Sequence, residues 1–210
     1  MRLLASAGLL TGVILLASCG TATDEPASPT SEPTAPSATT TTQTRPTLTN
    51  PKIQPPSQDN QYTRSSGRQH VVYDPCTWLS DDDVESMHFD PASRKRGEDL
   101  VAEYTFLSCN FRNSDQTMSM GVNSGNISWD ENLQKNGTWL EETTINGRRA
   151  GTGRGESNSA TKCEAHLETE VGVVLIWVRV TSLGERQNID PCADILEVAS
   201  VVERSIGEGN

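Results

Sequence analysis

Hydrophobic and polar residues follow three different patterns along the chain. Residues 3–16 are small or apolar almost throughout, and apolar side chains become scarce from residue 20 to about residue 69. From residue 70 onward they return at helical and strand spacings. These changes divide the chain into residues 1–18, 19–69 and 70–210, and only the last part has enough apolar residues for a hydrophobic core.

Several stretches of the third part alternate between apolar and polar residues, as half-buried strands do. We predict a long strand over residues 101–111 with a hairpin partner over residues 118–122. Asn146-Gly147 predicts the two-residue turn of another hairpin, because both residues accept positive φ. Another strand should carry Cys163, Ala165 and Leu167 on one face and hold a wet face made of Lys162, Glu164, His166 and Glu168. Residues 173–180 are apolar at nearly every position and should form a central strand.

Helices are indicated by capping residues. Asp74-Pro75 and Asp190-Pro191 each predict a helix start, since Asp accepts from free backbone amides and Pro suits the first helical position. Ser80 predicts a second cap, and Ser128 with Glu131 forms a capping-box pattern. A C-terminal helix is indicated by apolar residues on one face, namely Cys192, Ile195, Ala199, Val202 and Ile206. The order of elements predicts a single α+β domain with one twisted, mainly antiparallel sheet and helices packed on it.

The N-terminal pattern resembles the precursor of a bacterial lipoprotein. One cation, Arg2, precedes an apolar stretch that is shorter than the roughly 20 residues needed to span a bilayer. The stretch ends in Leu16-Ala17-Ser18-Cys19, which is similar to a lipobox. The resemblance implies cleavage before Cys19, lipidation of its thiol and anchoring at the extracytoplasmic face of the cell membrane. The alternative is an ordinary secreted protein in which Cys19 has no role.

Residues 19–69 are rich in Thr, Ser and Pro. Such a composition cannot offset the entropy of ordering, so we predict a disordered tether that spans on the order of 40 Å. The run of threonines over residues 39–42 would suit O-glycosylation, although an unmodified spacer is the simpler expectation. The segment contains eight of the eleven prolines: Pro26, Pro29, Pro33, Pro36, Pro46, Pro51, Pro55 and Pro56.

The charge and cysteine content fit this location. A net charge of −11 is unfavourable for nucleic acid binding, which depends on neutralising phosphates. Four cysteines lie in the domain without a Cys-x-x-Cys motif or a nearby histidine pair, so disulfides are expected rather than a metal site. Three pairings are possible. We prefer Cys76–Cys109 and Cys163–Cys192, because each would join a helix start to a nearby strand.

For the other candidate sites, structural roles are expected rather than chemical ones. Asp81-Asp82-Asp83 suits the first turn of a helix better than a Ca²⁺ site. The glycine-rich residues 151–155 lack the ending of a phosphate loop, and the three histidines are scattered. The basic stretches at residues 93–96 and 148–154 are expected in solvated loops. No cofactor, metal or catalytic residue is therefore assigned.

Several of these motifs occur in an order that resembles the domain-of-unknown-function 3558 family of actinobacterial lipoproteins. They are the two Asp-Pro-Cys starts, Ser108-Cys109, the hairpin at residues 145–150 and the strand that carries Cys163. Asn110 departs from the aromatic residue frequent at that position. The resemblance implies an envelope lipoprotein without established activity. We expect a non-catalytic interaction module; the alternative is a carrier or sensor of an apolar ligand, lined by residues 173–180 with Met118 and Met120.

Overall fold

A computed structural model describes residues 47–210, which belong to one compact unit that begins at Gln43. The expected signal peptide, the lipidation of Cys19 and the tether up to residue 46 lie outside the described residues. Within residues 47–210, none of the helices has the length and apolar character required to cross a membrane. The helices are η1 (Pro51–Ile53), α1 (Gln61–Ser66), α2 (Pro75–Trp78), α3 (Asp81–Ser86), α4 (Trp129–Asn136), α5 (Ser182–Arg186) and α6 (Ile195–Ile206).

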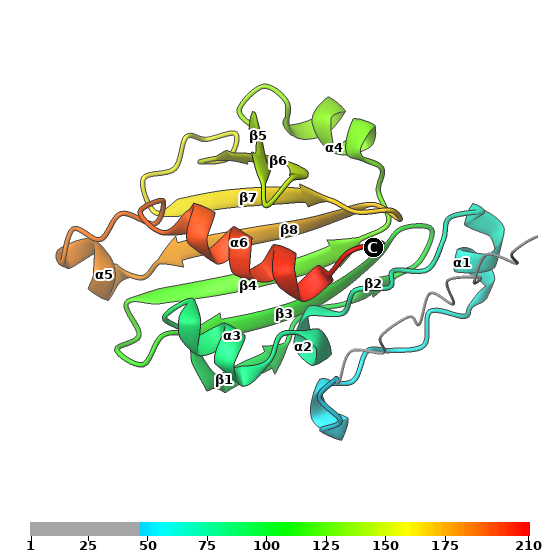
Figure 1. Cartoon of the computed structure of the whole chain (residues 1–210), viewed down its shortest axis with the longest axis horizontal. Helices are drawn as coiled ribbons and strands as arrows, with labels where there is room; N and C mark the ends of the chain where they lie inside the picture. Colours follow the sequence, from blue (N-terminus) through cyan, green and yellow to red (C-terminus); the bar gives the residue numbers. More distant parts are fainter. Residues whose placement is uncertain (1–46) are drawn as a thin grey trace, which may run out of the picture. The chain divides into compact units, whose positions relative to one another are not determined.

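The strands form one antiparallel sheet in the order β1-β3-β4-β8-β7-β6-β5, with β2 paired to β3. This arrangement confirms the predicted α+β class. Figure 1 shows α2, α3 and α6 on one face of the sheet. The strands are β1 (Asp90–Arg96), β2 (Leu100–Val101), β3 (Thr105–Arg112), β4 (Met118–Gly125), β5 (Glu141–Ile145), β6 (Arg148–Gly153), β7 (Lys162–Glu168) and β8 (Val173–Val180).

The main core lies between the sheet and these helices. Alternate residues of the central strands point into it, and α6 contributes Ile195, Val198, Val202 and Ile206. As predicted, β8 is central, and the Asn146-Gly147 turn joins β5 to β6 with φ of 51° and 87°. The predicted long strand is interrupted, because residues 102–104 separate β2 from β3.

Two disulfides fasten the helical layer to the sheet. Cys76 at the start of α2 is bonded to Cys109 of β3, and Cys163 of β7 is bonded to Cys192 before α6. Both preferred pairings are confirmed. Each bond closes a loop of about 30 residues, a length for which chain-entropy models give about 3–4 kcal/mol of stabilisation.

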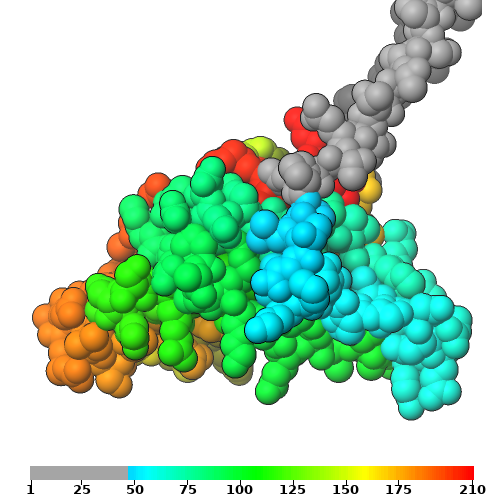
Figure 2. Space-filling model, turned by 90° about the horizontal axis from the view of Figure 1, so that it is seen from below, coloured from blue at the N-terminus to red at the C-terminus, as the bar shows by residue number. Residues whose placement is uncertain are grey.

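The domain begins earlier than the sequence pattern suggests, because residues 47–69 are ordered on its surface. Leu48 donates its backbone N–H to Thr77, and the side chain of Ile53 is buried. The amide of Gln58 pairs with the backbone of Val71. Figure 2 shows this blue-to-cyan segment lying against the green part of the domain. The assignment of residues 47–69 to the tether is therefore wrong. This segment has few apolar residues, but hydrogen bonds and the buried side chain of Ile53 hold it on the domain.

Two further local predictions need correction. The basic residues 93–96 belong to strand β1, where the side chains of Arg94 and Arg96 are only 6% and 12% exposed. The last helix begins at Ile195 rather than at Pro191. Asp190 still accepts from the backbone of Cys192, at 3.0 Å, but this bond closes a turn before the helix.

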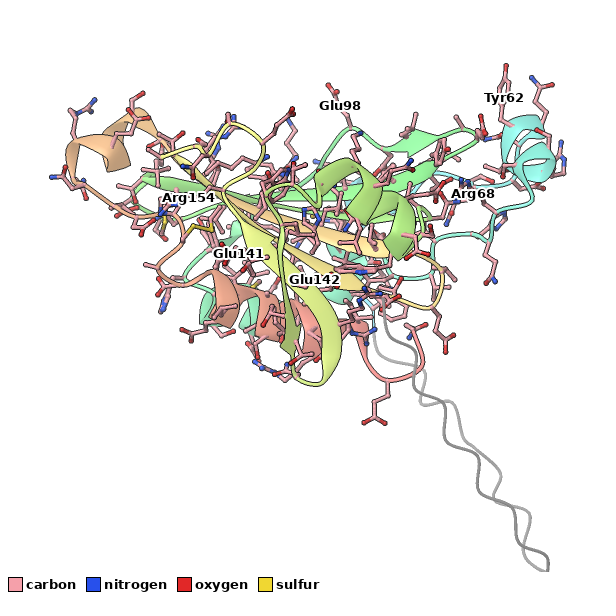
Figure 3. The ribbon with its side chains drawn as sticks, turned by 90° about the horizontal axis from the view of Figure 1, so that it is seen from above. Tyr62, Arg68, Glu98, Glu141, Glu142 and Arg154 are labelled. Carbon is pink, nitrogen blue, oxygen red and sulfur yellow. A yellow bond between two sulfur atoms is a disulfide. The ribbon has the colours of Figure 1, made fainter. Side chains whose placement is uncertain are left out.

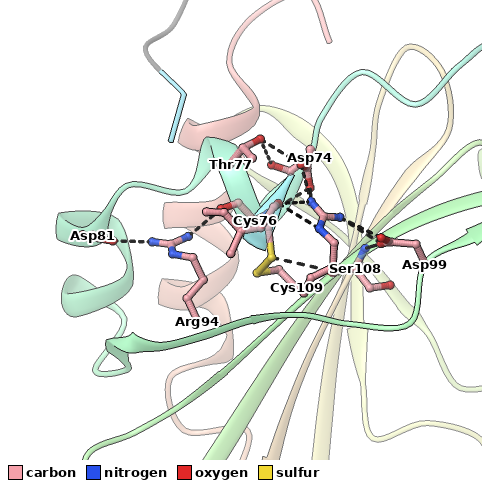
Figure 4. Close-up of a disulfide and its surroundings, with 10 residues drawn as sticks. Asp74, Cys76, Thr77, Asp81, Arg94, Asp99, Ser108 and Cys109 are labelled. Atoms are coloured by element: carbon pink, nitrogen blue, oxygen red, sulfur yellow. Dashed lines mark hydrogen bonds and ion pairs between the residues drawn. A yellow bond between two sulfur atoms is a disulfide. The ribbon is translucent and has the colours of Figure 1, made fainter. Parts of the chain in front are cut away.

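Arg96 is the centre of a buried polar network with Asp74 and Asp99, which lie near the first disulfide in Figure 4. Its guanidinium lies 2.6 Å from both carboxylate oxygens of Asp74 and 3.1 Å from Asp99. It also donates to the carbonyl oxygen of Ile53 at 2.8 Å. The two carboxylates accept in turn from the backbone amides of Cys76 and Ser108. One side chain thus connects η1, α2, β1 and the loop before β2.

We predict that Arg96→Leu lowers the free energy of unfolding by about 3–5 kcal/mol, because it leaves two buried carboxylates without their cation. Urea unfolding followed by tryptophan fluorescence measures the change. The control is Arg64→Leu, which breaks an exposed ion pair with Asp59 and should change stability by less than about 0.5 kcal/mol. Equal effects of the two substitutions would contradict a central role for Arg96.

Candidate functional site

The face of the sheet turned away from α6, which we call the far face, has a defined set of side chains. Cys109 points into the core, so its neighbour Asn110 points to the far face. The strand register places Lys95, Asn110, Gly121, Trp177 and Glu164 in one row across β1, β3, β4, β8 and β7. This row brings a cation, an amide, an indole and a carboxylate onto one surface.

Two neighbouring rows complete this surface. Arg112, Ser119, Arg179 and Lys162 form one of them, and Ser108, Asn123, Leu175 and His166 form the other. Neighbouring residues within a row lie in adjacent strands, whose backbones are about 5 Å apart. Their side chains are close enough to contact one ligand together. The far face is therefore mainly polar over β3 and β4 and becomes apolar toward one end of β8.

Helix α4 and the residues after it cover one half of the far face. Trp129, Leu140 and Val173 form a second buried cluster, and Leu133, Trp139 and Leu175 pack against it. Gly151 lies directly under Leu140, and Gly153 lies under Trp139, so that a Cβ at either position would meet these residues at 2.6–2.8 Å. Glycine in β6 thus lets the cover approach the sheet closely.

The uncovered half carries the candidate functional site. We call it the open face and define it as Lys95, Ser108, Asn110, Arg112, Ser119, Asn123, Trp177 and Arg179. All but Arg179 line a hollow of about 980 Å³, whose size is at the upper end of the range for ligand pockets. Glu98 also lines the hollow and projects on the side of the sheet opposite α6 (Figure 3).

The indole of Trp177 is held against the sheet by a glycine. A Cβ on Gly121, its partner in β4, would lie 2.2 Å from Cε2 of the ring. Any larger residue at position 121 would push the ring away from the strand. The guanidinium of Arg179 lies 5.8 Å from the ring centroid, within reach of a cation–π interaction. Trp177 is therefore a positioned aromatic surface that remains partly exposed.

The open face is cationic although the protein is acidic. Lys95, Arg112 and Arg179 are exposed, and none of them forms an ion pair with any carboxylate of residues 47–210. The other far-face cation, Lys162, is neutralised by Glu164 at 2.7 Å. Against a net charge of −11, this patch has the opposite sign to most of the molecule.

His166 lies at the border between the open and covered halves. It was expected on a wet strand face but is buried, because Trp139 packs on its ring edge-to-face and Asn132 of α4 contacts Nδ1 at 3.0 Å. Glu164 lies 3.5 Å from Nε2. Burial raises the pKa of Glu164, but hydrogen bonds from His166 and Lys162 outweigh it, so its pKa is lowered overall. This cluster supports α4.

The remaining sequence candidates do not converge on one place. Asp81, Asp82 and Asp83 occupy the first turn of α3, as expected. Within residues 47–210, the His, Cys, Asp and Glu side chains form no group of three suited to a metal ion. Residues 151–153 are part of β6 rather than a loop, and Arg154 forms an ion pair with Asp190 at 2.7 Å.

Sequence reasoning did not identify the open face. The sequence does contain a pattern that indicates it, because Ser108, Asn110 and Arg112 alternate with core residues. Ser119, Gly121 and Asn123 do the same in the next strand. Such alternation indicates a polar sheet face, but only the register shows that Trp177 lies among these residues.

Comparison with family models gives a match that covers most of the chain. The family model described as "Protein of unknown function (DUF3558)" matches residues 14–205. Neither the curated proteins nor the solved structures contain a match.

The position of α4, and with it the border of the open face, depends on Glu131. Hydrogen bonds from Arg68, and then from the backbone of Ser128, lower the pKa of Glu131 to about 2. Because this pKa is below that of the unfolded chain, the stabilisation is present above about pH 4.5 and disappears as the pH falls toward 2.

We therefore predict that Glu131→Gln destabilises the protein at pH 6 and that its difference from the wild type shrinks between pH 4.5 and 2. Urea unfolding at a series of pH values measures this difference. Glu141→Gln, at an exposed position, is the control and should follow the wild type throughout. If the difference in the free energy of unfolding between Glu131→Gln and the wild type did not change with pH, ionised Glu131 would not be the source of the stabilisation.

Proposed function

The chain belongs to the DUF3558 family of proteins of unknown function, and we propose that it is a lipid-anchored protein of the cell envelope that binds a partner through the open face. The single observation that carries this proposal is an uncovered, cationic half-sheet with one positioned indole on an otherwise acidic domain. Binding residues are commonly found where a rigid scaffold presents polar groups around an aromatic side chain.

The disulfides support the proposed location. Cys76–Cys109 and Cys163–Cys192 use all four cysteines of the domain, and such bonds persist in oxidising compartments outside the cytoplasm. The lipobox-like residues before Cys19 suggest a membrane anchor, and the proline-rich residues that follow suggest a spacer. The domain would then be displayed away from the membrane surface.

Binding is favoured over catalysis by the chemistry of the open face. Its charged groups are the cations Lys95, Arg112 and Arg179, which are suited to hold anions. The amides and hydroxyls around them are hydrogen-bonding groups rather than activated nucleophiles. Partner recognition is accordingly the activity that this arrangement supports.

The alternative, a carrier of an apolar ligand, loses its original support. Met120, Val174, Ile176 and Val178 are buried in the main core against the helices, where they fill space rather than line a cavity. Val173 and Leu175 pack with the residues of α4. Five apolar residues of β8 thus belong to two packed clusters.

The anchor is tested by Cys19→Ser expressed in the source organism. We expect the wild type in the membrane fraction with a mass increased by acyl chains, and the variant in the soluble extracellular fraction. Ser6→Ala, in the same apolar stretch, is the control and should behave as the wild type. Recovery of unmodified wild-type protein from the medium would refute the lipid anchor.

The binding surface is tested by photo-crosslinking in intact cells from position 119 of the open face. We expect a discrete product of higher mass from this position that disappears on Arg112→Glu, which reverses a charge of the face. Position 196 is the control, because the exposed Leu196 belongs to α6 on the opposite side of the sheet. The same products from both positions, or none from position 119, would contradict the proposed surface.

A further inference from the structure

We propose that the ligand of the open face is an anionic polysaccharide, with the indole of Trp177 as the platform on which a sugar ring stacks. This inference rests on the binding function proposed above and names the class of ligand. It combines three properties of the same surface: a fixed aromatic ring, side chains with hydrogen-bonding groups and cations without a carboxylate partner.

The indole is suited to a saccharide because of how it is held. One side of the ring lies against Gly121, and the ring lines the open hollow. The faces of aromatic rings carry partial negative charge, and the C–H bonds on one side of a sugar ring carry partial positive charge. Since the glycine and the strand already fix the ring, little conformational entropy is lost when a sugar ring packs on it.

The surrounding side chains match the hydroxyl groups of a sugar. Asn110 and Asn123 each offer donors and an acceptor, and Ser108 and Ser119 offer hydroxyls. Among residues 47–210, the side chains of these four residues form no hydrogen bond with another residue. Ser119 and Asn123 lie in β4, the strand next to that of Trp177, and Ser108 and Asn110 lie one strand further away in β3. Groups that exchange hydrogen bonds with hydroxyls therefore extend from one side of the stacking surface.

The cations indicate that the saccharide carries negative charge. The guanidinium groups of Arg112 and Arg179 match carboxylate or sulfate groups with paired donors, and Lys95 adds a point charge in the row of Trp177. Glu98 is a carboxylate in the lining of the same hollow, where three cations outnumber it. At physiological salt the screening length is about 8 Å, so the acidic surface farther away opposes an anionic ligand only weakly. Local attraction by the open face then determines binding.

The same surface fits a folded protein less well. Interfaces between proteins have a core of apolar and aromatic side chains that exclude water, whereas Trp177 is the single large apolar side chain among the eight residues of the open face. A single-stranded nucleic acid also combines stacked rings with phosphates, so it is included as a competing outcome of the test.

The test measures binding of the full-length protein, kept in a non-ionic detergent, to four immobilised probes. Dextran sulfate is the anionic polysaccharide, dextran is its neutral counterpart, polyglutamate is an anionic chain without sugars, and oligo(dT) is the nucleic acid. We expect dextran sulfate to bind on the order of tenfold more tightly than each of the other three. Increased salt should weaken this binding.

Trp177→Ala should lower the affinity for dextran sulfate on the order of tenfold, the usual effect of removing a stacking platform. Arg112→Ala and Arg179→Ala should lower it severalfold. The matched controls are Tyr62→Ala and Arg186→Ala, an exposed aromatic residue of α1 and an exposed arginine of α5, which should leave it unchanged. If Trp177→Ala fails to fold, Trp177→Tyr should retain binding that Trp177→Leu loses.

Three results would overturn the inference. Equal binding of polyglutamate, with no effect of Trp177 substitutions, would identify a simple anion-binding patch. Tightest binding of oligo(dT) would identify a nucleic acid surface. Failure of all four probes while crosslinking from position 119 succeeds would reject the polysaccharide and leave the proposed binding function intact, whereas failure of the crosslink would reject the binding function itself.

Discussion

The fold depends on one buried arginine. Arg96 holds Asp74, Asp99 and the carbonyl of Ile53 around a single guanidinium, next to the Cys76–Cys109 disulfide. Its partners Ile53 and Asp74 lie 43 and 22 residues before it in the chain, and Asp99 lies 3 residues after it. The cation therefore joins the N-terminal segment and the start of α2 to strand β1. Burying these charges is tolerable because backbone amides complete the hydrogen bonding of both carboxylates. Without this cation, the start of α2 and the N-terminal segment would lose their shared attachment.

The same arginine helps to build the open face. Because residues of a strand point alternately to opposite sides, fixing Arg96 and Arg94 toward the helices directs Lys95 to the far face. An edge strand that contains three consecutive basic residues would be expected to fray into solvent. Here two of them are neutralised by acidic residues of the helical layer, and the third becomes part of the candidate site.

Local signals in the sequence predicted the elements that local chemistry determines. Asn146-Gly147, the Ser128 capping box and the alternation around Cys109 each describe contacts among neighbours, and the structure confirms them. The positions of residues 47–69, Arg96 and His166 depend on contacts with residues far along the chain. The spacing of apolar and polar residues in the sequence does not reveal these contacts. The open face was visible as polar alternation. Its combination with Trp177 required the register of β4 against β8, where Gly121 provides the space.

The two halves of the far face show how a sheet surface becomes either a core or a binding site. Over β6 and β7, glycines allow Leu140 and Trp139 to approach the backbone, and the cover buries apolar side chains. Over β3 and β4, the outward residues of the open face are serines, asparagines and Arg112, whose burial without partners would cost free energy. Such a surface is stable in water without a cover. Trp177, in the neighbouring strand β8, is the exception. Its ring lies against Gly121 and stays partly exposed, so this aromatic side chain remains accessible at little cost to stability.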